Sequence, residues 1–208
     1  MQKTYFEYSE KELDYLCKKD KKLGEFIKQT GMLKRELNPD LPFALIESVV
    51  SQQISTKAAT TVISRLKALC NTDIQILNSL NIEQIQACGM SLRKASYIKD
   101  IAVAATLKTI DFEALPQKTD EDIIKELTKL KGIGIWTVQM LLIFSLSRKN
   151  IISYEDLAIR RGIMHIYNHK ELPKSRFLRY AKRYSPYASI ASLYLWEAYD
   201  AATQKYTI

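Results

Sequence analysis

The chain has 208 residues, of which 47% are hydrophobic and 26% are charged, with a formal net charge of +8 and a pI near 9.2. This length suits one or two closely packed domains, and the apolar content excludes an intrinsically disordered protein. The excess of basic residues favours a polyanionic partner such as nucleic acid.

Cysteine usage and the N-terminal residues indicate the cellular setting. Cys17, Cys70 and Cys88 are odd in number and far apart, so they form neither a disulfide framework nor a tight metal cluster. The N-terminus lacks an apolar signal core, and the longest apolar run, at residues 140–146, is too short to cross a bilayer. We expect a soluble cytoplasmic protein, nucleoid-associated in a bacterium or nuclear in a eukaryote, with no membrane partner.

Apolar residues recur at helical spacing along most of the chain, and glycine and proline are scarce. Neither Val49–Val50 nor Ile151–Ile152 alternates for long enough to predict a strand. The pattern predicts an all-α fold of about ten helices, with no linker between independent domains. The expected helical segments, some of them short, are residues 9–19, 21–30, 42–50, 56–69, 73–80, 82–87, 91–107, 119–130, 136–146, 157–167, 174–184 and 187–204.

A turn with two glycines, KGIGI at residues 131–135, joins two of these helices. Backbone N–H groups at the start of a helix lack intrahelical partners and carry partial positive charge, which suits a phosphate oxygen. Glycine lets another backbone approach such a turn closely. The alternative is an ordinary helical hairpin with a glycine C-cap. The residues predicted to dock DNA here are Lys131, Gly132, Ile133, Gly134 and Thr137.

An acidic pair, Glu155 and Asp156, follows the hairpin along the chain. Ser153 with Asp156 also fits a capping box, which would explain the acid without any chemistry. The motifs elsewhere in the chain favour a chemical role for Asp156.

Residues 127–138 followed by Asp156 resemble the helix-hairpin-helix and Gly/Pro-Asp (HhH-GPD) signature of the DNA glycosylase superfamily. Within it, the chain is similar to the alkylation-repair branch, the 3-methyladenine DNA glycosylase II type. Further resemblance lies in SVVSQQISTKAA within residues 45–59, GMSLRKASYIKDIA at 89–102, GIGIWTVQMLLIFSL in the hairpin, and PYASIASLYLW at 186–196. The match extends from residue 42 to residue 199.

The resemblance implies one glycosylase unit over residues 1–208, with two helical lobes and an active-site cleft between them. Lobe 1 is expected at residues 42–150, including the hairpin at 120–147. Lobe 2 is expected at residues 151–208, together with the N-terminal helices at 9–40.

The resemblance also bears on strand cutting and cofactors. Superfamily members that cut the DNA strand carry a lysine just after the hairpin, where this chain has Trp136, so a monofunctional glycosylase without lyase activity is implied. Relatives with an iron–sulfur cluster hold it on four C-terminal cysteines, and this chain has no cysteine after Cys88. His165 and His169 lack a third ligand nearby in sequence, so no metal site is expected. No cofactor is expected, although the hairpin backbone offers a place for a monovalent cation.

The family's pocket positions fall on an acid and several aromatic residues. Asp156 is the expected catalytic carboxylate, which would face the oxocarbenium-like sugar as the base leaves. Walls for a cationic flipped base would come from Trp136 and Trp196, with Tyr194 and Tyr154 as weaker candidates. The alternative for each aromatic residue is packing in a helical core.

Flipping a base leaves a gap in the duplex that a wedge must fill. The expected wedge loop is Gln52, Gln53 and Ile54, and the choice between the amide of Gln53 and the apolar Ile54 stays open. The alternative is a capped turn between two core helices. Arg93 and Lys94 are expected to contact phosphates.

The expected function is excision of alkylated purines from double-stranded DNA by a monomer, in base excision repair. Two alternatives remain: a non-catalytic module that binds damaged duplex, and a glycosylase for a deaminated or oxidised base. The chain departs from the family pattern at Tyr154, Glu155 and Ala188, where proline, aspartate and arginine are usual. These departures leave the preferred base open.

Overall fold

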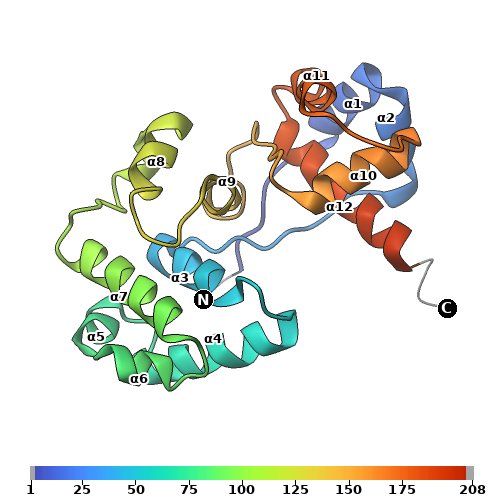
Figure 1. Cartoon of the computed structure of the whole chain (residues 1–208). Helices are drawn as coiled ribbons and strands as arrows, with labels where there is room; N and C mark the ends of the chain where they lie inside the picture. The colour runs from blue at the N-terminus through green and yellow to red at the C-terminus, as the bar shows by residue number, and fades with distance from the viewer. Residues whose placement is uncertain (1–2, 205–208) are drawn as a thin grey trace. The chain divides into compact units, whose positions relative to one another are not determined.

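The computed structural model describes residues 3–204, which form twelve α-helices and one 3-10 turn (Figure 1). The only β pairing in this part of the chain is an isolated bridge between Tyr5 and Glu36. The predicted all-α fold class is therefore confirmed. Among the described helices none is both long and apolar enough to span a membrane.

The chain divides into two compact units: unit 1 is residues 1–37 with 142–208, and unit 2 is residues 38–141. The boundary at Leu141 lies inside a helix, α9 (Ile135–Phe144), whereas lobe 1 was expected to extend to about residue 150. The reason is that the last turn of α9 packs within unit 1, where the ring centroid of Phe144 lies 5.4 Å from that of Trp196.

Unit 2 is organised around α7 (Leu92–Thr106), which packs against three other helices of the unit. Ala95, Ile98 and Ala102 are buried on one face of α7, at the spacing of successive helical turns. The other elements of unit 2 are α3 (Leu41–Ser51), α4 (Thr56–Cys70), α5 (Ile74–Ser79), α6 (Ile82–Gln86), η1 (Leu115–Gln117), α8 (Asp120–Leu127) and the first part of α9.

The helix starts in unit 2 are set by side-chain caps, as the sequence predicts. Ser55, Asp73, Ser91 and Thr119 each accept a hydrogen bond from a backbone N–H in the first turn of the following helix. The predicted boundaries therefore agree closely with the structure.

Unit 1 is a bundle of α1 (Glu10–Lys19), α2 (Lys21–Thr30), α10 (Leu157–Tyr167), α11 (Lys174–Tyr184) and α12 (Ala188–Gln204). Its most extensive helix–helix contact is between α10 and α12, which cross closely in Figure 1. A Cβ atom on Gly162 of α10 would stand 2.0 Å from the carbonyl oxygen of Leu195 in α12. Glycine at this position therefore lets the two helix backbones touch.

Candidate nucleic-acid interface and active site

The hairpin turn has the structure that its sequence predicts. Thr119 caps α8, and the turn that follows places Gly132 at a φ of 82°, a left-handed conformation that favours glycine. Ile133 is buried beneath the turn, and α9 begins at Ile135. As at the start of any α-helix, the first backbone N–H groups of α9 point out of its N-terminal end.

The two glycines of the turn have different environments. A Cβ on Gly132 would stand 2.3 Å from the ring of Tyr97, so this glycine is needed for packing inside unit 2. A Cβ on Gly134 would meet nothing within 4 Å, and Lys131 beside the turn is exposed. Gly134 thus lies on an open surface where another backbone can approach the start of α9. Thr137 is only 4% exposed, so α9 offers its backbone here more than its hydroxyl.

The expected wedge loop contacts the hairpin directly. The side-chain amide of Gln52 donates a hydrogen bond of 2.9 Å to the carbonyl oxygen of Gly132. Gln53 is exposed and has a φ of 58°, an uncommon conformation for a residue with a side chain. Ile54, next to it, is 41% exposed. The loop is therefore held at its base by Gln52 and presents both Gln53 and Ile54 to solvent.

Arg93 and Lys94 differ although they are neighbours. Arg93 is exposed at the start of α7, in keeping with a phosphate contact. The ammonium of Lys94 donates instead to the carbonyl oxygens of Val50, at 2.8 Å, and of Gln52. Burial, with a smaller effect of Arg93, lowers the pKa of Lys94. We therefore assign Lys94 to holding the C-terminus of α3 and the wedge loop in place, and not to phosphate binding.

A shallow hollow of about 290 Å³ lies between the wedge loop and the start of α7. The lining residues are Val50, Gln52, Gln53, Ile54, Gly89, Met90, Ser91, Arg93 and Lys94. Within unit 2, Gln52 lines this hollow and also donates a hydrogen bond to Gly132 of the hairpin.

Asp156 is the N-cap residue of α10 and is 7% exposed. One carboxylate oxygen, Oδ1, accepts a hydrogen bond of 2.9 Å from the backbone N–H of Ile159. The other, Oδ2, accepts one of 3.3 Å from the indole Nε1–H of Trp196 in α12. The alternative in which Ser153 forms a capping box with Asp156 is not seen, because the hydroxyl of Ser153 is buried without a hydrogen bond in the described part of the chain, but Asp156 itself does cap the N-terminus of α10.

Trp196 is held on two sides. Its ring lies 5.4 Å from that of Phe144, with 33° between the planes, and its Nε1–H points at Asp156. Because Gly162 brings α10 against the backbone of Leu195, the residue before Trp196, the carboxylate and the indole are kept within hydrogen-bonding distance. This half-buried tryptophan therefore contacts the carboxylate directly.

The other predicted pocket aromatics each have different surroundings. Tyr194 is fully buried, and its hydroxyl donates a hydrogen bond of 3.0 Å to the carbonyl oxygen of Gly31. We therefore assign Tyr194 to the core of unit 1 and not to a pocket wall. The ring of Tyr154 has Arg160 at 5.1 Å and Lys174 at 5.5 Å from its centroid, so cationic side chains already contact it. Trp136, in unit 2, is 39% exposed in the first turn of α9.

Three residues that shape these sites were missed from the sequence: Tyr97, Phe144 and Gly162. Of these, only Gly162 carried a visible signal, because glycine inside a helical pattern is costly unless close packing requires it.

The two histidines do not share a helix. Asn168 ends α10 in a left-handed conformation with φ of 55°, and His169 lies beyond it. Its Nε2 is 2.8 Å from the hydroxyl of Tyr180. Residues 3–204 contain no group of three or more His, Cys, Asp or Glu side chains placed to hold a metal ion. A monovalent cation at the hairpin backbone stays a prediction.

The fold, the glycine turn with its open α9 start and the capped carboxylate define an all-helical helix-hairpin-helix protein. Residues 46–186 match the model of the HhH-GPD superfamily of base excision DNA repair proteins, and the chain belongs to this superfamily.

A sequence and a solved structure from Schizosaccharomyces pombe are similar to this chain over most of their length. "DNA-3-methyladenine glycosylase 1" of Schizosaccharomyces pombe is 33% identical over 183 residues, which cover 85% of this chain and 78% of the relative. The solved structure of the S. pombe enzyme Mag1 with abasic DNA aligns with a TM-score of 0.79 at 32% identity, covering 90% of this chain and 95% of Mag1.

A bacterial structure is similar as well. The DNA-3-methyladenine glycosidase of Bacillus halodurans aligns with a TM-score of 0.84 at 29% identity, and the alignment covers 99% of this chain and 95% of that protein. The predicted superfamily is therefore confirmed.

Proposed function

We propose that this protein is a monofunctional DNA glycosylase that hydrolyses the N-glycosidic bond of alkylated purines in duplex DNA. The observation that carries the proposal is the carboxylate of Asp156, oriented by Ile159 N–H and Trp196 Nε1–H in a member of a base excision repair superfamily. The names of the relatives, which are 3-methyladenine DNA glycosylases, support alkylated bases as the substrate class.

The first step is extrusion of the damaged base from the helix. The base must leave the stack to be reached, and this costs a few kcal/mol, less for a damaged base. The exposed wedge loop, with Gln53 and Ile54, would fill the vacated space. The open start of α9 at Gly134 would bind a backbone phosphate without regard to sequence.

An alkylated purine carries positive charge and leaves readily, so the enzyme has little need of a general acid. Bond breaking places positive charge on the sugar, and the carboxylate of Asp156 would stabilise it and take a proton from the attacking water. The base departs with the electron pair of the broken bond, and the oxygen of the deprotonated water bonds to the sugar C1′. The exposed Trp136 stands where strand-cutting relatives carry a lysine, so no amine is offered to form a Schiff base.

The aromatic rings supply selectivity for a cation. The indole of Trp196 cannot turn freely, because Phe144 and Asp156 hold it, so it offers a fixed π-face.

We further propose that the protein acts as a monomer without a cofactor, in the compartment that contains the genome.

The deciding experiment is Asp156→Asn on methylated duplex DNA, with abasic sites detected as alkali-labile breaks. Asparagine also caps helices well, so the fold should be kept, while base release falls by about 100- to 1,000-fold. Glu155→Gln, which removes the same charge from the exposed neighbour, is the matched control and should keep the wild-type rate.

Each part of the proposal has its own contrary result. Equal base release by wild type and Asp156→Asn would remove the carboxylate from the mechanism. Strand breaks without alkali would contradict the monofunctional assignment. Tight binding of methylated duplex by the wild type with no base release would show a non-catalytic binding protein.

A further inference from the structure

The positive charge of the protein is distributed very unevenly between the two units. Unit 1 contains 20 lysines and arginines against 12 aspartates and glutamates, a formal charge of +8. Unit 2, which carries the hairpin and the wedge loop, contains 11 of each and is formally neutral. The whole net charge of the chain therefore lies outside the unit that contains the DNA-docking hairpin.

Within unit 1, α11 concentrates this charge on one side. Its sequence KSRFLRYAKRY has five basic residues and no acid. Phe177, Tyr180 and Tyr184 are buried at i, i+3 and i+7, and they anchor the helix to the bundle. Arg179 and Lys182 are left exposed on the outer side.

An ion pair between the buried Asp20 and the exposed Arg183 links the junction of α1 and α2 to α11. Asp20, between α1 and α2, is 4% exposed and accepts hydrogen bonds from Leu23 N–H at 3.0 Å and from Arg183 Nη1 at 2.6 Å. Exposed lysines flank Asp20 on both sides in the sequence. We call the basic face of unit 1 the set Lys18, Lys19, Lys21, Lys22, Arg179 and Lys182, all of them exposed.

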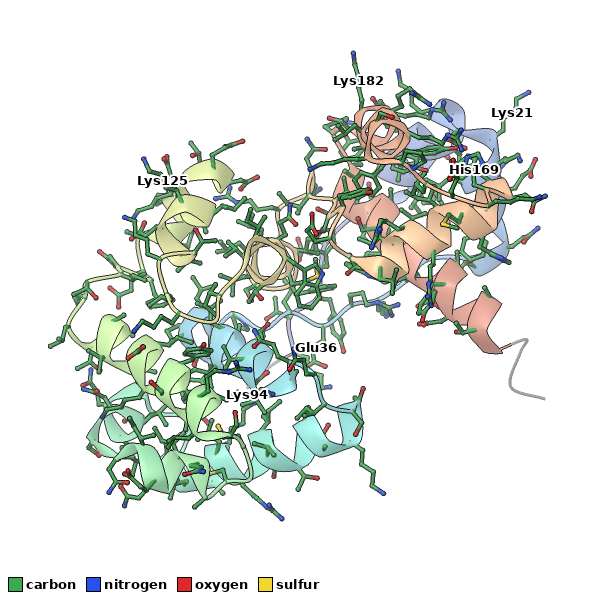
Figure 2. The ribbon with its side chains drawn as sticks, viewed as in Figure 1. Lys21, Glu36, Lys94, Lys125, His169 and Lys182 are labelled. Atoms are coloured by element: carbon green, nitrogen blue, oxygen red, sulfur yellow. The ribbon has the colours of Figure 1, made fainter. Side chains whose placement is uncertain are left out.

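This face is not explained by ion pairing or helix stability. Lys18, Lys21, Arg179 and Lys182 form no ion pair with any residue in the described range 3–204. Lys21 stands in the first turn of α2, where the helix dipole disfavours a cation. Figure 2 shows Lys21 and Lys182 extending outward from unit 1. Exposed basic residues without ion-pair partners attract polyanions.

We propose that the basic face of unit 1 binds the phosphate backbone of duplex DNA, as a second contact surface separate from the hairpin. Duplex DNA carries a negative charge about every 1.7 Å along its axis, and basic side chains bind it by releasing counterions, without reading sequence. An enzyme that searches undamaged DNA for rare lesions gains from such binding, because it permits sliding. The proposal rests on the proposed function, since that function makes duplex DNA the polyanion this protein must search.

The test is the salt dependence of binding to undamaged duplex DNA, measured by fluorescence anisotropy with the full chain. In Arg179→Gln/Lys182→Gln, the slope of log affinity against log salt should become shallower by about 2, and affinity near 0.1 M salt should fall about tenfold or more. The matched control, Lys108→Gln/Lys125→Gln, removes the same two charges from exposed positions of unit 2 and should keep the wild-type slope. Thermal melting checks that both variants are folded.

Two further measurements separate this proposal from the proposed function. Arg179→Lys/Lys182→Arg, which keeps both charges, should restore the slope. At saturating DNA, base release by Arg179→Gln/Lys182→Gln should proceed at the wild-type rate, since neither residue takes part in the two hydrogen bonds that orient Asp156. An unchanged slope in the folded double variant overturns the proposal, as does an equal loss in the control, which would show an effect of net charge alone. Neither result would bear on Asp156, whose role is tested by base release.

Discussion

The close packing of α10 against the backbone of α12 at Gly162 gives the sharpest test of how the carboxylate is positioned. In Gly162→Ala the new Cβ would stand 2.0 Å from the carbonyl oxygen and 2.8 Å from the carbonyl carbon of Leu195. Real Cβ atoms essentially never come within 3.0 Å of another heavy atom, and no flexible side chain is available to move. The helices α10 and α12 must therefore separate by about 1 Å.

Two effects of different size follow from this separation. Overpacking of this kind costs about 3 kcal/mol, which for a chain of this length lowers Tm by about 6–12 °C. The Trp196–Asp156 hydrogen bond is already 3.3 Å long, and it would stretch beyond the length at which it holds the carboxylate. Since a misplacement of about 1 Å costs about 100-fold in rate, base release should fall by about that factor.

The assay is single-turnover base release from methylated duplex, at a temperature where melting curves show the variant fully folded. Gly24→Ala is the matched control, because its Cβ would stand 2.8 Å from Cys17 Cα at the contact of α1 with α2, away from Asp156. It should lose stability and keep its rate. If both variants keep the wild-type rate when folded, Gly162 serves stability alone and the positioning argument is refuted.

Further predictions concern the hairpin, one acidic residue and one lysine. Gly134→Ala should weaken DNA binding about tenfold and leave Tm unchanged, because its Cβ would meet nothing within 4 Å. Gly132→Ala should lower Tm, because Gly132 has a positive φ and its Cβ would stand 2.3 Å from the ring of Tyr97. Lys149 and Ser9 lower the pKa of Glu12 from 4.5 to about 2, so its stabilisation is complete above pH 4.5 and is lost as the pH falls toward 2. In urea unfolding, the free energy of unfolding of the wild type should fall by up to about 3 kcal/mol relative to that of Glu12→Gln as the pH is lowered over that range. Lys94→Gln should lower Tm and leave the salt slope of DNA binding unchanged, because its ammonium binds carbonyl oxygens.

Most of the fold could be predicted because its signals are local. The caps at Ser55, Asp73, Ser91 and Thr119 lie within three residues of the N–H groups that they satisfy, so sequence spacing alone places the helix starts. The domain boundary could not be predicted, since nothing in α9 marks the point where its side chains change partners. That boundary depends on Phe144 meeting Trp196, which is 52 positions later in the sequence.

The residues of the candidate site could be predicted from the sequence, but the contacts between their side chains could not. Asp156 and Trp196 were both expected, but their hydrogen bond joins residues 40 positions apart. Tyr194 could have been set aside from the sequence, because two residues along a helix are about 200° apart and cannot face the same carboxylate. The adjacent Arg93 and Lys94 differ for a related reason: about 100° of rotation turns Lys94 toward the end of α3 and leaves Arg93 outside.

The division into units shows that the net positive charge of the chain and the hairpin belong to different parts of the protein. A net charge of +8 suggested nucleic acid, and the hairpin motif suggested where it binds, yet the hairpin belongs to the neutral unit. Docking at Gly134 depends on backbone N–H groups that act within a few ångströms, so it needs no net charge. Attraction of DNA over a Debye length of about 10 Å does need a net positive charge, and only unit 1 has one. Short-range docking and long-range attraction can therefore be altered separately in this protein: a hairpin variant should change affinity with little effect on the salt slope, and a variant of the basic face should change the slope.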